Sequence, residues 1–170
     1  MPDVPKVKVD DRKAAEWVRS LSEKHNLVTY EGKTITTLAD IPKGKFALTV
    51  IQIDGRSVNE PVTAESLKVL SGLGKLVELH ITHTKLPDEA FDFLATLPAL
   101  ETLKIEDTGS TDSVVGKAAA CKSLKRVEFV ELPQFTGAAL GQLKDLRQLS
   151  ELRCYKTALN DAGITGIGQL

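Results

Sequence analysis

Apolar residues recur along the chain in one spaced pattern, apolar-x-x-apolar-x-apolar. Its five copies are Leu48/Ile51/Ile53, Leu76/Leu79/Ile81, Leu100/Leu103/Ile105, Leu124/Val127/Phe129 and Leu149/Leu152/Cys154. The first members of successive copies lie 28, 24, 24 and 25 residues apart. The alternation in the second half of each copy is the period of a strand with one buried face. The pattern therefore predicts five short parallel strands in a repeat architecture.

A second apolar series, with a spacing of three residues, follows each of these predicted strands. Its members are Leu67/Leu70/Leu73, Phe91/Leu94/Leu97, Val115/Ala118/Cys121, Leu140/Leu143/Leu146 and Ile164/Ile167/Leu170. This spacing predicts short α or 3₁₀ helices. Polar residues suited to cap them stand just before, at Thr63, Asp88, Asp112, Thr136 and Asp161. Because no single strand-turn-helix unit can cover its own apolar face, we expect the units to stack around one continuous core.

These spacings resemble those of bacterial leucine-rich-repeat proteins, in which the unit ends Thr-x-(Leu/Val)-Thr-Asp-Ala-Gly-Leu. The resemblance lies in Thr84 and Thr157 at the turn and in the stretches 86–91 (LPDEAF) and 159–164 (LNDAGI). The opening stretches 14–21 (AAEWVRSL) and 38–44 (LADIPKG) are similar to the lead-in of such proteins in planctomycete-type bacteria. The resemblance implies an α/β leucine-rich-repeat solenoid of the ribonuclease-inhibitor-like class, with a parallel sheet on the concave side and helices on the convex side.

The domain organisation that we expect has three parts. Residues 1–12 form a flexible tail, 13–45 a capping segment, and 46–170 a leucine-rich-repeat domain of about five repeats. In the capping segment, Ala14, Trp17, Val18 and Leu21 share one helical face, which favours Trp17 as a core residue over a ligand-binding one.

The two ends of the predicted repeat array differ. A hairpin follows the capping helix, with strands Leu27–Tyr30 and Thr34–Leu38 around residues 31–33. At the other end, strand 149–154 is predicted to have an unpaired edge. Two alternatives are open for this edge: the chain forms a homo-oligomer through it, or it abuts further sequence of a longer protein.

Residues that point away from the core along the strands form the predicted concave face. On it, Lys104, Glu128 and Arg153 alternate in charge, which indicates either mutual neutralisation or a docking surface with complementary charge. Acidic residues in the middle (Glu106, Asp107, Glu128 and Glu131) suit a basic partner segment, and Tyr155 beside Val130 suits an interface anchor. The predicted partner-binding residues are Glu78, His80, His83, Lys104, Glu106, Glu128, Val130, Arg153 and Tyr155.

Two histidines, His80 and His83, raise the alternative of a zinc site with the neighbouring carboxylates. They stand three residues apart on a strand and its turn, so their rings need not converge. Solvated surface histidines are the simpler interpretation, and a pH-sensitive contact is a third. Cys121 and Cys154 occupy positions filled elsewhere by leucine or isoleucine, which indicates inert buried thiols. We expect no metal, no cofactor and no catalytic residues.

The composition narrows the class of partner. The 22 basic and 23 acidic residues nearly cancel, so no overall field favours nucleic acid or a membrane surface. No apolar run reaches the roughly 18 residues that span a bilayer, and the N-terminus lacks a signal-peptide core. We expect a soluble cytoplasmic protein and a non-enzymatic protein-binding module that uses its concave face to bind a protein or peptide. The alternative is an assembly protein whose solenoid ends mediate oligomerisation or continue into a larger chain.

Overall fold

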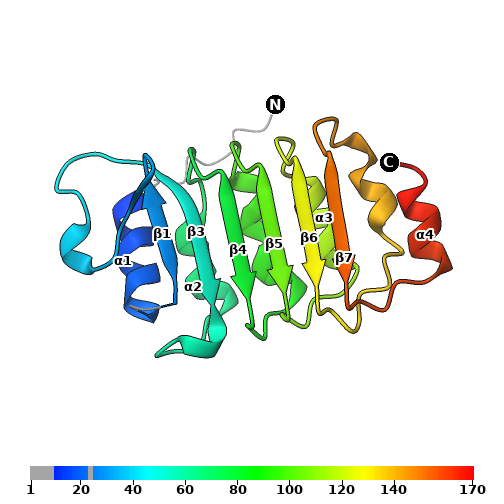
Figure 1. Ribbon diagram of the computed structural model, residues 1–170, viewed down its shortest axis with the longest axis horizontal. Coiled ribbons are helices and arrows are strands. Elements are labelled where there is room, and N and C mark those ends of the chain that lie inside the picture. The colour runs from blue at the N-terminus through cyan, green and yellow to red at the C-terminus, as the bar shows by residue number, and fades with distance from the viewer. Residues whose placement is uncertain (1–9, 23–24) are drawn as a thin grey trace.

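The apolar triplets form strands of one open α/β sheet, which the computed structural model describes over residues 10–22 and 25–170. Its strands are β1 (Leu27–Tyr30), β2 (Lys33–Thr34), β3 (Leu48–Asp54), β4 (Glu78–Thr82), β5 (Thr102–Glu106), β6 (Arg126–Val130) and β7 (Glu151–Tyr155). Their order across the sheet is β2-β1-β3-β4-β5-β6-β7, and the helices lie on one face of it (Figure 1). The expected α/β class is confirmed.

Strands β3 to β7 run parallel and pair in the register that the sequence predicts. Ile51, Leu79, Leu103, Val127 and Leu152 lie opposite one another in a single row. The first four are completely buried, whereas Leu152 is only partly buried. Each completely buried aliphatic side chain contributes about 1.5 to 3 kcal/mol. The strand prediction is confirmed, and these residues form one continuous row through the core.

Short α and 3₁₀ helices return the chain from each strand to the next. They are α2 (Ala64–Leu67), η3 (Lys68–Leu70), η4 (Asp88–Thr96), α3 (Ser113–Ala119), η5 (Leu140–Asp145) and α4 (Asp161–Ile167). The 3₁₀ segments suit the apolar spacing of three, because side chains three residues apart lie above one another in that helix. No helix in the described residues is long and apolar enough to span a bilayer.

The helical apolar series is buried in the first four units but not in the last. Every member from Leu67 to Leu146 has 4% exposure or less, whereas Ile164, Ile167 and Leu170 are 58%, 38% and 50% exposed. The exposure of this last triplet agrees with the unpaired edge that was expected at this end of the repeat array. The reason is geometric: the apolar face of each helix is covered partly by the unit that follows, and no unit follows α4 among the described residues.

Two of the predicted caps link neighbouring units instead of capping their own helices. Thr63 caps α2 as predicted, by accepting from the amide of Ser66. Asp88, however, accepts from the amide and hydroxyl of Thr111 in the next unit, at 3.0 and 2.6 Å. Asp112 likewise accepts from Thr136 and from the Gly137 amide. These carboxylates satisfy buried donors across the stack, so they stabilise the packing of one unit on the next.

The helix before the repeats overlaps the end of the segment that was assigned to the N-terminal tail. Helix α1 (Asp11–Leu21) starts inside the segment 1–12 that was predicted as a flexible tail, and residues 1–9 of that segment lie outside the described residues. Asp10 caps the helix, and the Asp11 carboxylate accepts from the Leu48 amide at 2.7 Å, so the helix start is tied to β3. Its predicted apolar face is confirmed, with Trp17 partly buried against the core.

The predicted hairpin forms with a shorter second strand. Glu31 and Gly32 both have left-handed backbones, with φ of 46° and 76°, as a two-residue hairpin turn requires. Strand β2 ends at Thr34, and Leu38 begins the 3₁₀ helix η1 (Leu38–Asp40), where it is 56% exposed. The Asp40 carboxylate ends the strand by accepting hydrogen bonds from residues 36 and 37.

The two cysteines differ in burial. Both are free thiols; Cys121 is buried as expected, but Cys154 on β7 is only partly buried, which corrects the expectation for that residue. Burial raises the pKa of Cys121 to about 12 and that of Cys154 to about 11, so neither is a ready thiolate near neutral pH.

Truncation of equivalent leucines should therefore have unequal costs. Leu103→Ala should lower the free energy of unfolding by about 2 to 5 kcal/mol, because it opens a cavity between two flanking units. Leu152→Ala at the edge should cost clearly less. Chemical denaturation of dilute protein measures both, and equal losses would contradict a core in which each unit is buried by its neighbours.

Candidate binding site on the open face

The face of the sheet away from the helices, here called the open face, carries every second strand residue. Strand pairing in register places these side chains in rows, with neighbours about 4.8 Å apart. The rows are Val50, Glu78, Thr102, Arg126 and Glu151; Gln52, His80, Lys104, Glu128 and Arg153; and Asp54, Thr82, Glu106, Val130 and Tyr155. They contain all the predicted partner-binding residues except His83, which lies in the turn after β4.

The turns that follow β4 to β7 share one unusual conformation. The residue after each strand has a left-handed backbone, with φ of 53°, 45°, 52° and 51° at His83, Asp107, Glu131 and Lys156. The His83 amide donates to the Glu106 carbonyl oxygen at 2.8 Å, and the next two turns repeat this bond to the following strand. The stacking of units thus holds a conformation that is costly for residues other than glycine, and it fixes a fourth row of side chains.

Most charges on the open face are paired with one another. Lys104 contacts Glu106 at 2.5 Å, and Lys156 contacts Glu131 at 2.6 Å. Arg153 contacts Glu151 at 2.5 Å and Glu128 at 3.4 Å. In the alternating row, Arg153 therefore pairs with Glu128, whereas Lys104 pairs with Glu106 on its own strand. Three of the four predicted acidic residues each have a cationic neighbour. Exposed pairs of this kind contribute only about 0 to 1 kcal/mol each, so they order the surface more than they stabilise the fold.

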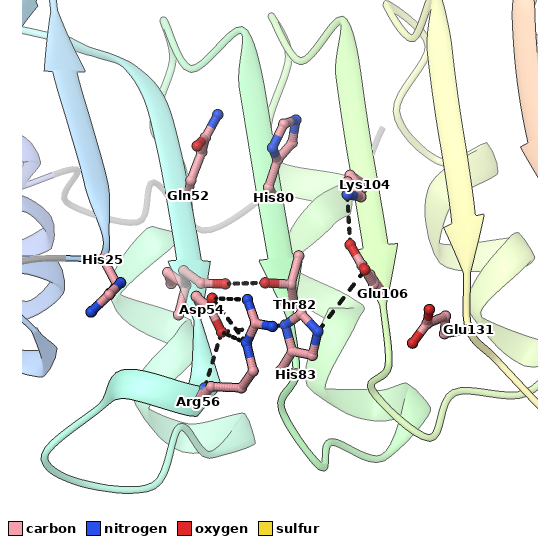
Figure 2. Close-up of a pocket in the computed structure, with 11 residues that line it drawn as sticks. His25, Gln52, Asp54, Arg56, His80, Thr82, His83, Lys104, Glu106 and Glu131 are labelled. Atoms are coloured by element: carbon pink, nitrogen blue, oxygen red, sulfur yellow. Dashed lines mark hydrogen bonds and ion pairs between the residues drawn. The ribbon is translucent and has the colours of Figure 1, made fainter. Parts of the chain in front are cut away.

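A polar pocket of about 520 Å³ lies over β3, β4 and β5 at the end of the open face nearer the N-terminal hairpin. Figure 2 shows its lining residues, which come from these strands, the turns after β3, β4 and β6, and the segment before β1. The lining includes His25, His80 and His83, which are all the histidines of the sequence. It also holds three carboxylates (Asp54, Glu106 and Glu131) against two permanent cations (Arg56 and Lys104), so the pocket is slightly acidic when the histidines are neutral.

His83 is held between two carboxylates at the floor of this pocket. Its Nδ1 lies 3.3 Å from an Asp54 oxygen and its Nε2 lies 4.0 Å from a Glu106 oxygen (Figure 2). The buried Nδ1 has no hydrogen-bond partner within the part of the chain that the structure describes. It is therefore close to the Asp54 carboxylate without the geometry of a hydrogen bond. Gly55 makes this packing possible, because a Cβ there would lie 2.1 Å from the His83 carbonyl oxygen.

Arg56 closes one side of the pocket from the 3₁₀ turn η2 (Gly55–Ser57). Its guanidinium binds the Asp54 carboxylate through Nε and Nη2, with a shortest contact of 2.6 Å. These hydrogen bonds are the main cause that lowers the pKa of Asp54 to about 2, against the opposing effect of burial. Asp54 is therefore a carboxylate at any physiological pH.

The pocket does not assemble a set of metal ligands. Over residues 10–22 and 25–170, no three or more His, Cys, Asp or Glu side chains are placed to hold one metal ion. His80 and His83 do face the same pocket, but their imidazoles contact different carboxylates: His80 contacts Glu78 at 3.3 Å and His83 contacts Asp54. The arrangement instead offers paired donors and acceptors to a polar or cationic group.

A second, less polar hollow lies at the opposite end of the open face. It has a volume of about 530 Å³ and is lined by Glu128, Val130, Leu152, Arg153, Cys154 and Tyr155. Tyr155 is 61% exposed, and the Lys156 ammonium lies 5.5 Å from the centre of its ring. The exposed aromatic residue expected beside Val130 is thus present, in the row that the register predicts.

Seven pocket residues were not among the predicted partner-binding residues: His25, Gln52, Ile53, Asp54, Arg56, Thr82 and Glu131. Of these, Arg56 and His25 lie outside the regular strand-and-turn positions of the repeats. Arg56 had a sequence signal: the first unit is 28 residues long where the others have 24 or 25, and the longer turn after β3 contains it. His25 had none, because it precedes β1 outside the repeats and reaches the pocket only through the antiparallel pairing of β1 with β3.

Comparison with known proteins adds no identification. No protein-family model and no curated protein sequence matches the chain.

The burial of His80 predicts a loss of stability on mild acidification. Burial is the largest cause that lowers the pKa of His80, with Lys104 adding to the effect and Glu78 opposing it. Because the folded state disfavours the imidazolium, stability is complete above the unfolded pKa of about 6.5 and falls as the pH drops below it. The thermal unfolding midpoint should therefore fall between about pH 7.5 and about pH 5.5.

His80→Gln should reduce this fall, while His25→Gln, which removes an exposed histidine of the same pocket, should leave it close to that of the wild type. Calorimetry of the three proteins at both pH values makes the comparison. An identical fall in the wild type and His80→Gln would show that the burial of His80 has no part in it.

Proposed function

We propose that this chain is a leucine-rich-repeat solenoid and a non-enzymatic protein-binding module, whose open face is the concave face that receives a protein or peptide. The likeness of its units to bacterial leucine-rich-repeat proteins suggests the class. The in-register stacking of β3 to β7 supports it, since each unit adds one strand and one helix to a continuous core. A cytoplasmic location belongs to the same proposal, and the two free cysteines suit it.

The observation that carries the binding proposal is the continuous set of polar rows on the open face. The rows cross five strands without interruption and are held in place by ion pairs and by the turn hydrogen bonds. Such a surface is ordered before a partner arrives, which lowers the entropic cost of binding. Tyr155, Arg153 and Val130 supply the residue types that commonly dominate binding energy.

The charge of the pocket indicates what part of a partner it receives. Three carboxylates and two permanent cations line the pocket, and the cation that pairs with Glu131, Lys156, is exposed outside it. A lysine or arginine side chain of a partner can therefore take the place of Lys156, whereas an anion would meet three carboxylates. Glu106 and Glu131 line the pocket on the side of β5 and β6, as Figure 2 shows. We therefore expect the partner to present a basic segment along the open face.

Selection from a displayed random-peptide library tests this function. The enriched peptides should contain lysine or arginine, and their affinity should fall by about tenfold or more in the double variant Glu106→Gln/Glu131→Gln. The matched control is Glu89→Gln/Asp145→Asn, which makes the same change of net charge at exposed residues of η4 and η5. The control should bind as the wild type does.

Two results would contradict the proposal. One is the absence of any enriched peptide; the other is an equal loss of affinity in both double variants, which would reflect overall charge and not the pocket. Circular dichroism of each variant establishes that the fold is retained.

A further inference from the structure

The end of the stack at β7 and α4 exposes an apolar surface, here called the terminal face, formed by Leu152, Cys154, Leu159, Ile164 and Ile167. The residues in the same positions of the preceding unit, such as Val127, Phe129, Leu140 and Leu143, are buried to 1% exposure or less. The terminal face therefore has the composition of an interior layer without a covering layer. Contiguous exposed apolar surface of this kind marks interaction sites in natural proteins.

The exposed isoleucines of α4 belong to a helix that is packed firmly against the preceding unit. Gly163 and Gly166 are buried against η5, where a Cβ would lie 2.6 Å from the Thr136 carbonyl oxygen and 3.0 Å from the Gly141 amide nitrogen, respectively. The helix thus sits close to its neighbour through its glycines. As a consequence its isoleucines, Ile164 and Ile167, are turned away from the core that they resemble.

The two edges of the sheet are not complementary to one another. At the hairpin end, the edge strand β2 has two residues, Lys33 and Thr34, both exposed, and a short lysine-bearing edge discourages strand addition. At the other end, β7 has five residues and is paired on one side only within the described chain. Head-to-tail stacking of copies is therefore disfavoured, and a twofold arrangement that joins like edges is the closed alternative.

Charge complementarity along β7 selects one such arrangement. In an antiparallel pair of two β7 strands centred on Leu152, each Glu151 lies opposite Arg153 of the second copy. Because Glu151 contacts Arg126 and Arg153 of its own chain at 2.5 Å, the new pairs extend an existing network of alternating charges across the joined edges. Leu152 lies opposite its own equivalent on the buried side. The register shifted by one pair, centred on Arg153, places two arginines directly opposite each other and is disfavoured.

We infer that the terminal face binds a second copy of this chain, through antiparallel pairing of β7 centred on Leu152. The twofold axis is perpendicular to the sheet, so the sheet continues from one copy into the other and the two α4 helices cover one another's isoleucines. Both open faces then lie on the same side of the joined sheet. The dimer is compatible with binding on the open face and does not depend on it.

A charge-swap mixture tests the pairing and its register. Wild-type protein should sediment as a dimer in analytical ultracentrifugation. Glu151→Arg alone places arginine opposite arginine, and Arg153→Glu alone places glutamate opposite glutamate, so each variant alone should be mainly monomeric. An equimolar mixture should form a dimer again, because both cross-strand pairs then join opposite charges. Loss of folding in a variant cannot produce this recovery.

The exposed pair Glu65 and Lys68, on α2 and η3, supplies the matched control. Glu65→Arg and Lys68→Glu should each remain dimeric when alone. Wild-type protein that stays monomeric up to roughly 1 mM, where contacts as weak as about 4 kcal/mol are populated, would overturn the inference. So would a dimer that persists in both β7 variants, since its interface would lie elsewhere, or a mixture that stays monomeric, since the two charges would not be opposed.

Discussion

Parallel pairing of β3 to β7 in one register is the constraint on which the rest of the structure depends. It places Leu79, Leu103 and Val127 in a single buried row, and each of them is removed from water by the units on either side. The carboxylates of Asp88 and Asp112 follow the same logic, because each satisfies donors that belong to the next unit. Stability therefore resides between units more than within them, which is the behaviour of quasi-one-dimensional proteins.

The same register builds the surface that we propose as the binding site. Side chains alternate between the two faces of a strand, so strands whose core residues are aligned also align the residues between them on the open face. The rows of charged residues therefore arise without any dedicated loop. Arg153 meets Glu128 because strand pairing leaves them adjacent, whereas Lys104 and Glu106 meet because they are two residues apart on β5 and so share one face of the sheet. The pocket is the exception, since it also needs His25 and Arg56 from outside the regular rows. This end of the open face is therefore less regular than the rest of it.

The sequence predicted those structural features that follow from the spacing of apolar residues, and it did not predict the others. Strand positions, their register and the rows of the open face were predictable, because a period of two assigns every strand residue to a face. The bonds that Asp88 and Asp112 make to the next unit could not be predicted. A carboxylate just before a helix can accept from the amides of that helix as well as from those of the next unit. The exposure of Ile164 does not follow from its local pattern, which matches an interior unit, because exposure depends on what lies beside it in the fold. The pocket also required the contact of His25, which carries no sequence signal because it depends on the antiparallel pairing of β1 with β3.

Hydrogen exchange of the backbone amides in dilute native protein tests most directly whether the units share one core. If stacking provides the stability, the amides of β4, β5 and β6 should exchange slowest and at similar rates, because they open only when the stack unfolds. Those of β7 and α4 should exchange faster, since one side of that unit is uncovered. Widely different rates among β4, β5 and β6, or protection of β7 equal to theirs in dilute protein, would contradict a single core buried by neighbouring units.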